Sequence, residues 1–360
     1  MGEKIVVAMS GGVDSSVAAA LLVEQGCEII GISMQTWDHN ADKTFGSCCS
    51  PRDLADARQV AYELGIPHYL LNFEQQFESA VVNYFVSEYL QGRTPNPCVV
   101  CNQKVKFDTL LLRARMLGAD KVATGHYARL LGGGSERLRV ARGRDQAKDQ
   151  SYFLFNLSQE QLAHTLFPLG EFTKEEVRVM AEKHRLPVAN KPESQEICFI
   201  PDNDYAGFVR RRAPEVADRA GDIVNPQGKI VGRHRGYPNY TIGQRKGLRV
   251  SSREPLYVLE IDTNRNRLVV GKNEELLHTV CVVENVRWML VPELNGEREA
   301  SVQIRHRHGG ARSVLRSGPG ADEVTVTFHT PQRAITPGQA AVFYENDEIL
   351  GGGWIKQVLK

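Results

Sequence analysis

The sequence contains no long apolar run, and no segment approaches the roughly 20 residues that a membrane-spanning helix needs. It also has no excess of either charge, because 44 lysines and arginines face 43 aspartates and glutamates. A uniformly basic nucleic-acid coat is therefore excluded, and any nucleic-acid contact must come from local basic patches. A strand-like segment begins at residue 4, which leaves no room for a signal peptide, so we expect a cytoplasmic protein without membrane contact.

Cysteine is scarce, with seven residues in 360, and the spacing of a structural zinc site is missing. Cys98 and Cys101 form one Cys-x-x-Cys, but no second pair follows them. The side chains of the adjacent Cys48-Cys49 are expected to point apart, which disfavours ligation by both. Cys27 and Cys281 lie in apolar contexts and are predicted to be buried packing residues. Taken alone, the Cys-x-x-Cys is compatible with zinc, an iron–sulfur cluster, a redox dithiol or no function.

The first 130 residues alternate between short apolar runs and amphipathic helical patterns, which is typical of a parallel sheet with helices on both faces. Ligands bind such sheets beyond the carboxyl ends of the strands. The predicted strands are Lys4–Met9, Glu28–Gln35, Ile66–Asn72 and Lys121–Thr124, and the predicted helices are Val13–Gln25, Pro51–Gly65, Glu74–Gln91 and Lys104–Gly118. A hairpin around Leu131–Ser135 and helices over Ser158–His164 and Thr173–Arg185 follow.

The remainder of the chain is rich in short strands separated by turns, beginning near residue 220. Asn225–Gly228 and Asn264–Asn266 have the composition of hairpin turns. We therefore expect an α/β protein with three parts: a catalytic domain over 1–204, a small β-rich module over 205–273 and a C-terminal β-barrel over 274–360.

Ser10–Ser16, the stretch SGGVDSS, joins the first strand to the first helix. Glycine permits backbone angles closed to other residues, and the unpaired N–H groups at a helix N-terminus favour an anion. The stretch lacks the Gly-Lys-Ser/Thr of a Walker loop. It resembles the SGGxDS loop of the N-type ATP pyrophosphatases, the PP-loop superfamily. That resemblance implies ATP binding with Mg²⁺, attack of a substrate oxygen on the α-phosphorus and release of pyrophosphate.

The cysteines suggest a sulfur nucleophile. Asn96 and Pro97 suit the cap and first turn of a helix, which would place Cys98 and Cys101 on one face near its positive end. A thiol in that place has a lowered pKa. Cys198 follows a polar segment and precedes Phe199-Ile200, which are suited to anchor it.

Basic residues gather locally in three places, although the total charge is close to neutral. Such runs are most often solvated faces, but in a protein that binds RNA they are natural phosphate contacts. The three groups are Arg210–Arg212, then Arg245 with Lys246 and Arg249, and finally Arg305 with Arg307 and Arg312. Tyr237 and Tyr240 are expected to be core residues rather than stacking platforms.

Ordered landmarks over nearly the whole chain resemble the bacterial tRNA-specific 2-thiouridylases, the MnmA/TrmU family. The matching stretches are SGGVDSS, GRTPNP with Cys101-Asn102, ATGHYAR, KDQSYFLF, ICFI, TIGQRKGL and PGQAAVFY. The resemblance implies conversion of the 2-oxygen of the wobble uridine (U34) to sulfur, with ATP and a relayed persulfide. It also implies two partners, namely tRNA and a persulfide donor (a cysteine desulfurase or a sulfur relay protein).

The resemblance assigns roles position by position. Cys198 matches the cysteine that receives the persulfide, and Cys101 matches the nucleophile that can form a disulfide with it. Asp14, within the loop, is expected to be required for adenylation. The ATP contacts would be Ala8, Met9, Ser10, Gly11, Gly12, Val13, Asp14, Ser15, Met34 and Gly125. Asn96, Pro97 and Cys98 match the segment that meets the target base, and the tRNA contacts would be His126, Lys148, Asp149, Gln150, Arg305, His306 and Gln339.

One residue departs from the family pattern, because Cys98 stands where members carry an aspartate. Cys98, Cys101 and Cys198 would then form a three-thiolate set of the kind that holds a [4Fe–4S] cluster with one open iron. A persulfide/disulfide route and a cluster-assisted route therefore remain as alternatives. Two alternative functions differ more from tRNA thiolation. One is an ATP pyrophosphatase acting on a small molecule, and the other is a non-catalytic nucleic-acid-binding module with a structural metal.

Overall fold

The computed structural model describes residues 2–37, 50–193, 197–200 and 202–359. Cys48 and Cys49 lie outside the described residues. Contacts divide the chain into two compact units, of which the first comprises residues 1–82, 97–203 and 347–349. The second comprises residues 83–96, 204–346 and 350–360. Within the described part, no helix has the length and apolar character needed to cross a bilayer.

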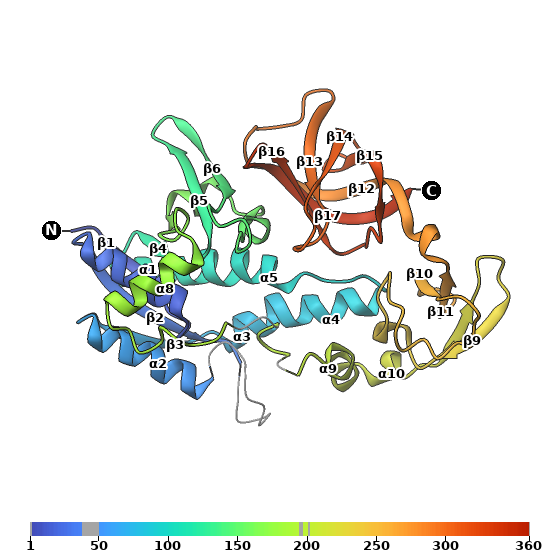
Figure 1. Ribbon diagram of the computed structural model, residues 1–360, viewed down its shortest axis with the longest axis horizontal. Coiled ribbons are helices and arrows are strands. Elements are labelled where there is room, and N and C mark those ends of the chain that lie inside the picture. The colour runs from blue at the N-terminus through green and yellow to red at the C-terminus, as the bar shows by residue number, and fades with distance from the viewer. Residues whose placement is uncertain (1, 38–49, 194–196, 201, 360) are drawn as a thin grey trace. The chain divides into compact units, whose positions relative to one another are not determined.

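The first unit is built on a five-stranded sheet in the order β3-β2-β1-β4-β7, with every neighbouring pair parallel (Figure 1). The strands are β1 (Lys4–Ala8), β2 (Glu28–Gln35), β3 (His68–Asn72), β4 (Lys121–Ala123) and β7 (Thr165–Leu166). The parallel sheet predicted from the sequence is confirmed, with β7 as an additional edge strand. Because β1 is central, the loop that follows Ala8 leaves from the middle of the carboxyl edge.

Helices pack on this sheet through apolar side chains. Ile5, Val7 and Met9 of the first strand and its exit share a core with Val17 of α1 and Val60 of α2. The helical segments of the unit are α1 (Val13–Glu24), α2 (Pro51–Glu63), α3 (Glu74–Phe77), η1 (Glu78–Val82), α5 (Pro97–Val100), η2 (Cys101–Thr109), α6 (Leu110–Met116), η3 (Ser151–Leu154), α7 (Gln159–Ala163) and α8 (Lys174–Lys183). The predicted hairpin is confirmed as β5 (Ala128–Gly133) with β6 (Glu136–Arg142).

Two of the predicted helices contain π-helical turns. The helix predicted over 74–91 runs as α3, η1 and α4 (Asn83–Leu90), and the one predicted over 104–118 begins earlier, at Pro97, and runs as α5, η2 and α6. Both η1 and η2 are π-helical. A periodicity of 3.6 does not reveal such turns, which often occur at functional sites. Cys101 is the first residue of η2.

The second unit contains a four-stranded sheet in the order β10-β11-β8-β9, in which only β11 and β8 pair in parallel. Its strands are β8 (Gly221–Val224), β9 (Ile230–His234), β10 (Tyr257–Asp262) and β11 (Arg267–Gly271), accompanied by α9 (Tyr205–Arg212), α10 (Pro214–Ala217) and η4 (Tyr237–Asn239). Both predicted hairpin turns join these strands. Tyr237 and Tyr240 are buried in the core of the sheet, as expected.

Six further strands of this unit close into an antiparallel barrel, as the sequence predicts. Their order is β12-β15-β14-β13-β16-β17, and β12 also pairs with β17. The strands are β12 (Leu277–Trp288), β13 (Arg298–Gln303), β14 (Ala311–Ser317), β15 (Val324–Arg333), β16 (Ala340–Glu345) and β17 (Glu348–Leu359), and η5 (Asn273–Leu276) precedes them. Cys281 is fully buried among their apolar side chains, whereas Cys27 is only partly buried.

Candidate active site

The loop after β1 is held by hydrogen bonds from its own serines. Ser15 Oγ and Ser16 Oγ donate to the carbonyl oxygen of Gly12, at 3.1 and 2.9 Å, and Ser10 N donates to Ser15 Oγ at 3.2 Å. Gly12 is the N-cap of α1, without a side-chain cap. The first N–H groups of a helix have no acceptor inside it. The loop therefore presents its backbone N–H groups, and not its serine hydroxyls alone, to an anion.

Two glycines allow other segments to approach this loop closely. Gly11 has φ = +72°, and a Cβ there would lie 2.0 Å from the carbonyl oxygen of Asp53 on α2. A Cβ on Gly125 would lie 2.7 Å from both Asp14 C and Ser15 N. Gly125 follows β4, so the exit of β4 can contact the loop after β1 this closely only because Gly125 carries no side chain, and Gly11 allows the same closeness to α2.

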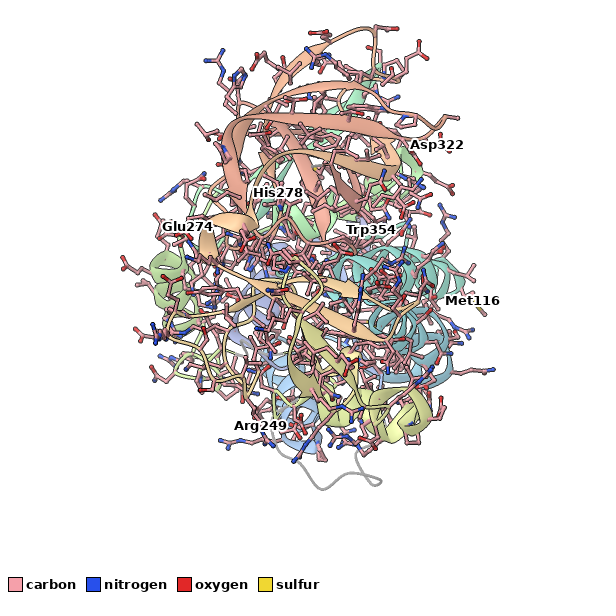
Figure 2. The ribbon with its side chains drawn as sticks, turned by 90° about the vertical axis from the view of Figure 1, so that its right-hand side faces the viewer. Met116, Arg249, Glu274, His278, Asp322 and Trp354 are labelled. Carbon is pink, nitrogen blue, oxygen red and sulfur yellow. The ribbon has the colours of Figure 1, made fainter. Side chains whose placement is uncertain are left out.

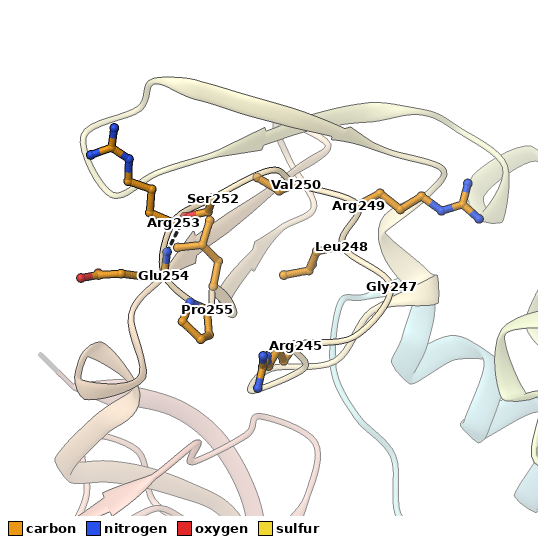
Figure 3. Close-up of a pocket in the computed structure, with 10 residues that line it drawn as sticks. Arg245, Gly247, Leu248, Arg249, Val250, Ser252, Arg253, Glu254 and Pro255 are labelled. Carbon is orange, nitrogen blue, oxygen red and sulfur yellow. Dashed lines mark hydrogen bonds between the residues drawn. The ribbon is translucent and has the colours of Figure 1, made fainter.

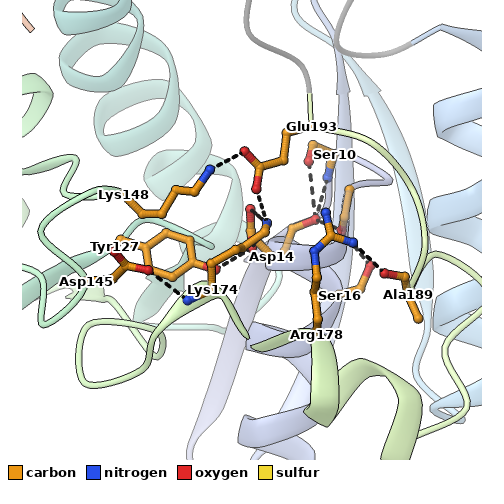
Figure 4. A network of polar contacts seen from close by, with 12 residues as sticks. Ser10, Asp14, Ser16, Tyr127, Asp145, Lys148, Lys174, Arg178, Ala189 and Glu193 are labelled. Atoms are coloured by element: carbon orange, nitrogen blue, oxygen red, sulfur yellow. Dashed lines mark hydrogen bonds and ion pairs between the residues drawn. The ribbon is translucent and has the colours of Figure 1, made fainter. Parts of the chain in front are cut away.

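Asp14 is held by two partners that are remote in the sequence (Figure 4). Tyr127 donates its hydroxyl to Asp14 Oδ1 at 2.7 Å, and Lys174 Nζ lies 2.7 and 2.9 Å from the two carboxylate oxygens. Lys174 is the first residue of α8 and is only 7% exposed. Burial and the nearby Asp14 carboxylate raise the pKa of Tyr127 well above its usual value, so the phenol stays protonated and donates.

Glu193 joins a second lysine to this cluster. Its carboxylate lies 2.9 Å from Lys174 Nζ and 2.6 Å from Lys148 Nζ. Partial burial would raise the pKa of Glu193, but the two ammonium groups outweigh it and lower the pKa. Asp14, Lys174, Glu193 and Lys148 thus form a continuous chain of alternating charges, here named the ion chain, beside the loop (Figure 4).

Lys191 ties the loop to α2. Its ammonium group donates to the carbonyl oxygen of Gly11 at 2.9 Å and to the carboxylates of Asp53 and Asp56, each at 2.5 Å. Burial alone would lower the pKa of Lys191, but the two carboxylates raise it overall. Lys191 and Glu193 precede Cys198 by seven and five positions in the sequence, and they bind residues 191–193 to the loop and to its partner Lys174.

The cysteine segments are arranged around α3. Phe199 is buried, with its ring 5.5 Å from that of Phe77 and 6.3 Å from that of Trp37. Phe77 is the last residue of α3, which contacts η2, the segment that begins at Cys101. Cys98 is exposed, whereas Cys101 and Cys198 are partly buried. The two remote cysteines therefore belong to segments that contact the same short helix.

Cys98, Cys101 and Cys198 are not arranged as a ligand set for a metal. Among the residues described here, no group of three histidine, cysteine or acidic side chains is arranged to hold a metal ion. A [4Fe–4S] cluster on Cys98, Cys101 and Cys198 requires three sulfurs directed at one centre. The three cysteines therefore do not fit this cluster.

Comparison with known proteins settles the family. Residues 3–202 match the tRNA methyl transferase HUP domain, residues 208–272 the tRNA methyl transferase PRC-barrel domain and residues 278–355 the aminomethyltransferase beta-barrel domain. A tRNA-specific 2-thiouridylase MnmA of Acidobacterium capsulatum is 51% identical, covering 98% of each chain. One of Geobacter metallireducens is also 51% identical, covering 98% of this chain and 96% of the relative. The chain belongs to the tRNA-specific 2-thiouridylase family.

Two solved structures overlap with this thiouridylase-family chain in part. A 4-thiouridine synthetase in a complex with RNA and bound ATP has a TM-score of 0.36 at 15% identity, covering 59% of this chain and 51% of that one. An NMN synthetase from Francisella tularensis has a TM-score of 0.33 at 18% identity, covering 57% of this chain and 73% of that one. The family assignment rests on the sequence relatives.

The remaining expected ATP contacts lie at the carboxyl ends of the central strands. Ala8 ends β1, and Met9 is buried with its carbonyl oxygen accepting from Ser33 Oγ at 2.7 Å. Met34 is the next-to-last residue of β2 and is partly buried. These positions adjoin the loop through strand pairing, since Ala8 is paired with Ile32 of β2.

Several positions that the thiouridylase resemblance assigns to tRNA have internal partners in the first unit. His126 is buried, with Nδ1 2.7 Å from Thr124 Oγ1, and burial holds its pKa well below the usual value. Asp149 pairs with Arg142 at 2.9 Å, and Gln150 Oε1 accepts from the backbone N–H of Tyr127 at 3.0 Å. Their placement indicates that they shape the site. Whether they also touch RNA stays a prediction.

In the second unit, Gln339 supports the chain that leads to the Cys-x-x-Cys. Its Nε2 donates to the carbonyl oxygens of Thr94 and Pro95, at 3.1 and 3.0 Å. Asn96 is buried beside them, whereas Arg305 and His306 are exposed. At the start of the first unit's next segment, Pro97 is buried and Cys98 is exposed. Of this set, Cys98, Arg305 and His306 are exposed at the surface.

Sequence reasoning missed four functional candidates: Tyr127, Lys174, Lys191 and Glu193. A signal was available for the last two, because both charged residues stand within a few positions of Cys198 in KPESQEIC. Lys174 had no such signal, since it reads as an ordinary residue of an amphipathic helix. Asp14, which the resemblance assigns to adenylation, does not cap α1 and is paired with Lys174.

Proposed function

We propose that the protein is a tRNA-uridine 2-sulfurtransferase that adenylates the C2 oxygen of the wobble uridine (U34) with ATP and then replaces that oxygen by sulfur. The observation that carries this proposal is that Lys191 and Glu193, a few positions before Cys198 in the sequence, are bound to the loop after β1 and to the partner of Asp14. Lys191 binds Gly11, and Glu193 shares Lys174 with Asp14. Family membership supports the substrate, because the curated relatives are named tRNA-specific 2-thiouridylases.

Adenylation is assigned to the loop and the ion chain. Oxide is a poor leaving group, and attack of the uridine oxygen on the α-phosphorus converts it into an AMP leaving group. The backbone N–H groups after Ser10 would receive the departing pyrophosphate at the N-terminus of α1. Lys174 would keep Asp14 oriented and add positive charge beside the phosphates. Mg²⁺ would accompany ATP as the ion of the substrate.

Sulfur transfer is assigned to Cys198 and Cys101. A donor protein would first load Cys198 as a persulfide. The Cys101 thiolate would attack the inner sulfur, which releases hydrosulfide and leaves a Cys101–Cys198 disulfide. Hydrosulfide would attack C2 of the adenylated base and expel AMP, and an external thiol would then reduce the disulfide. The two Cα atoms must come within about 7 Å for this step.

The proposal also covers the roles of the domains, the residues that contact tRNA and the location of the protein. We assign catalysis to residues 1–204 and tRNA contacts to both this part and the β-rich parts 205–273 and 274–360. Arg305, His306 and Lys148 would contact tRNA directly, and Asn96, Pro97 and Cys98 would line the path to the target base. Because tRNA is modified in the cytoplasm, we also propose that location.

The test separates the two half-reactions. Cys198→Ser should release pyrophosphate in the presence of tRNA but form no 2-thiouridine, measured by chromatography of digested tRNA. Cys101→Ser should also release pyrophosphate, but should block turnover after persulfide loading. Cys27→Ser, at a partly buried cysteine away from the proposed chemistry, is the matched control and should keep both activities. Thiouridine formed by Cys198→Ser at the wild-type rate would refute the proposal.

Cys98→Asp distinguishes the sulfur routes. A carboxylate at this exposed position keeps activity if the persulfide route operates, because the two essential thiols remain. If a three-cysteine cluster is needed, the variant loses both iron and activity. Anaerobic purification with iron and sulfide analysis of both proteins provides a readout independent of turnover.

A further inference from the structure

The loop between η4 and β10 in the second unit contains a depression of about 320 Å³ (Figure 3). We name residues 245–256 the basic loop. Arg245, Arg249 and Arg253 line the depression, and all three side chains are exposed. Figure 2 labels Arg249 among the side chains drawn on this part of the ribbon.

Apolar residues fix the loop and leave its arginines outside. Leu248 is buried in the core of the small sheet, and Val250 and Leu256 pack against that core. The arginines alternate with these anchors along the chain, and Figure 3 shows Arg253 and Arg249 extending away from the loop in different directions. The residues that flank the basic loop are also joined, because Gly243 N donates to the carbonyl oxygen of Val258 at 2.8 Å.

The arginines of the basic loop lack anionic partners. Within the described part of the chain, none of the three forms an ion pair, and the one carboxylate in the lining, Glu254, is 2.6 Å from Lys272. Other arginines of the same unit are paired, such as Arg267 with Asp262 at 2.9 Å. The depression therefore has an uncompensated positive charge.

The backbone of the loop supports a specific arrangement of these charges. Arg249 has φ = +54°, in the left-handed region that residues other than glycine rarely occupy. Backbone in this region persists where the surroundings determine it, and such residues cluster at ligand-binding positions. Here the buried neighbour Leu248 supplies that constraint.

We infer that the basic loop is a binding surface for the phosphate backbone of tRNA. The inference rests on the proposed function and adds a contact region to it. Guanidinium groups bind phosphate oxygens through two parallel hydrogen bonds. Each exposed arginine is weak alone, but a polyanion engages several at once and releases counterions from each phosphate. The open, exposed depression fits a chain of phosphates better than a single enclosed anion.

The experiment measures tRNA affinity against salt. In the test variant, Arg245, Arg249 and Arg253 are changed to glutamine in the full-length protein. The matched control changes three ion-paired arginines of the same unit, Arg233, Arg265 and Arg316, to glutamine, so that both variants lose the same charge. Filter binding of full-length substrate tRNA across a salt series gives the slope of log Kd against log salt for each.

Each lost phosphate contact lowers this slope by about 0.9. We expect the test variant to lose about two to three units of slope, to raise KM for tRNA at least about tenfold and to keep kcat at saturating tRNA. The control should keep the slope of the wild type within about half a unit. ATP binding should be unchanged in both variants, which shows that both are folded.

Equal slopes for the test variant and wild type would overturn the inference, and so would an equal loss in both variants. The outcome is separable from the proposed function. If wild-type protein forms no 2-thiouridine, the proposed function fails, whereas normal thiolation with unchanged slopes refutes only the role of the basic loop.

Discussion

The ion chain and the basic loop hold similar numbers of charged side chains, but those of the ion chain are paired with opposite charges and the arginines of the basic loop are not. In the ion chain every lysine is within 3 Å of a carboxylate, and Lys174 touches two. In the basic loop the arginines have no carboxylate partner within the described residues, because Glu254 is taken by Lys272. Paired, partly buried charges hold their geometry before a ligand arrives. Unpaired exposed charges remain available to bind a long anion such as an RNA backbone.

The largest effect is expected from removing the centre of the ion chain. Lys174→Gln leaves Asp14 and Glu193 facing each other without the shared ammonium group, so the loop loses its orientation and a charge beside the phosphates. Pyrophosphate release at saturating ATP and tRNA should fall about 100-fold or more. The matched control is Lys183→Gln on the same helix, whose surface pair with Glu24 at 3.4 Å should contribute little. A Lys174 variant within about threefold of wild type would show that the ion chain only supports the fold.

The next largest effect is expected from salt, which should weaken tRNA binding at the basic loop more than ATP binding beside the ion chain. With a slope of about 0.9 per phosphate, three contacts weaken tRNA binding roughly 40-fold when salt rises fourfold. The partly buried ion chain is screened less, so KM for ATP should change by less than about threefold over the same range. Steady-state kinetics with one substrate varied at each salt concentration checks both. Equal salt dependence of the two KM values would remove the distinction between the regions.

Gly125→Ala tests the packing that brings the two strand exits together. The new Cβ would require a shift of about 0.7 Å, from 2.7 Å to the 3.4 Å of an ordinary contact with Asp14 or Ser15. A displacement of this size should reduce pyrophosphate release about tenfold. Gly309→Ala meets no atom within 4 Å and serves as the control. Unchanged activity of Gly125→Ala would mean that the loop tolerates the shift.

The smallest effect concerns acid stability. The lysines lower the pKa of Glu193, so its ionised form stabilises the folded protein above the ordinary carboxyl pKa of 4.5, and this contribution is lost as the pH falls through the lowered pKa. Glu193→Gln should remove that contribution. Between about pH 6 and pH 3.5, the free energy of unfolding should fall less steeply for the variant, by at most about 1 kcal/mol. Urea denaturation at several pH values measures it, and parallel curves would contradict the expectation.

The sheet, the barrel and the nucleotide loop follow from local patterns, because strand periodicity and glycine positions are encoded over a few residues. The partner of Asp14 does not, since Lys174 lies 160 positions away and only the tertiary fold brings them together. The π-helical turn at Cys101 was also not predicted, because the amphipathic pattern of the flanking residues fits an ordinary helix. For Arg245 and Arg249 the sequence shows the charge, but only the structure shows that neither has an anionic partner.

If Cys198 carries the transferred sulfur, as proposed, the buried ring of Phe199 limits how far that sulfur can move. Adjacent Cα atoms are about 3.8 Å apart and a cysteine side chain adds less than about 3 Å, so the sulfur of residue 198 stays within roughly 7 Å of that anchor. Delivery by a long swinging arm is therefore excluded while the ring stays packed against Phe77 and Trp37. Under the proposed function, the sulfur donor and the acceptor tRNA must therefore reach the same small volume, one after the other. Loading and use of the sulfur then become mutually exclusive events in time.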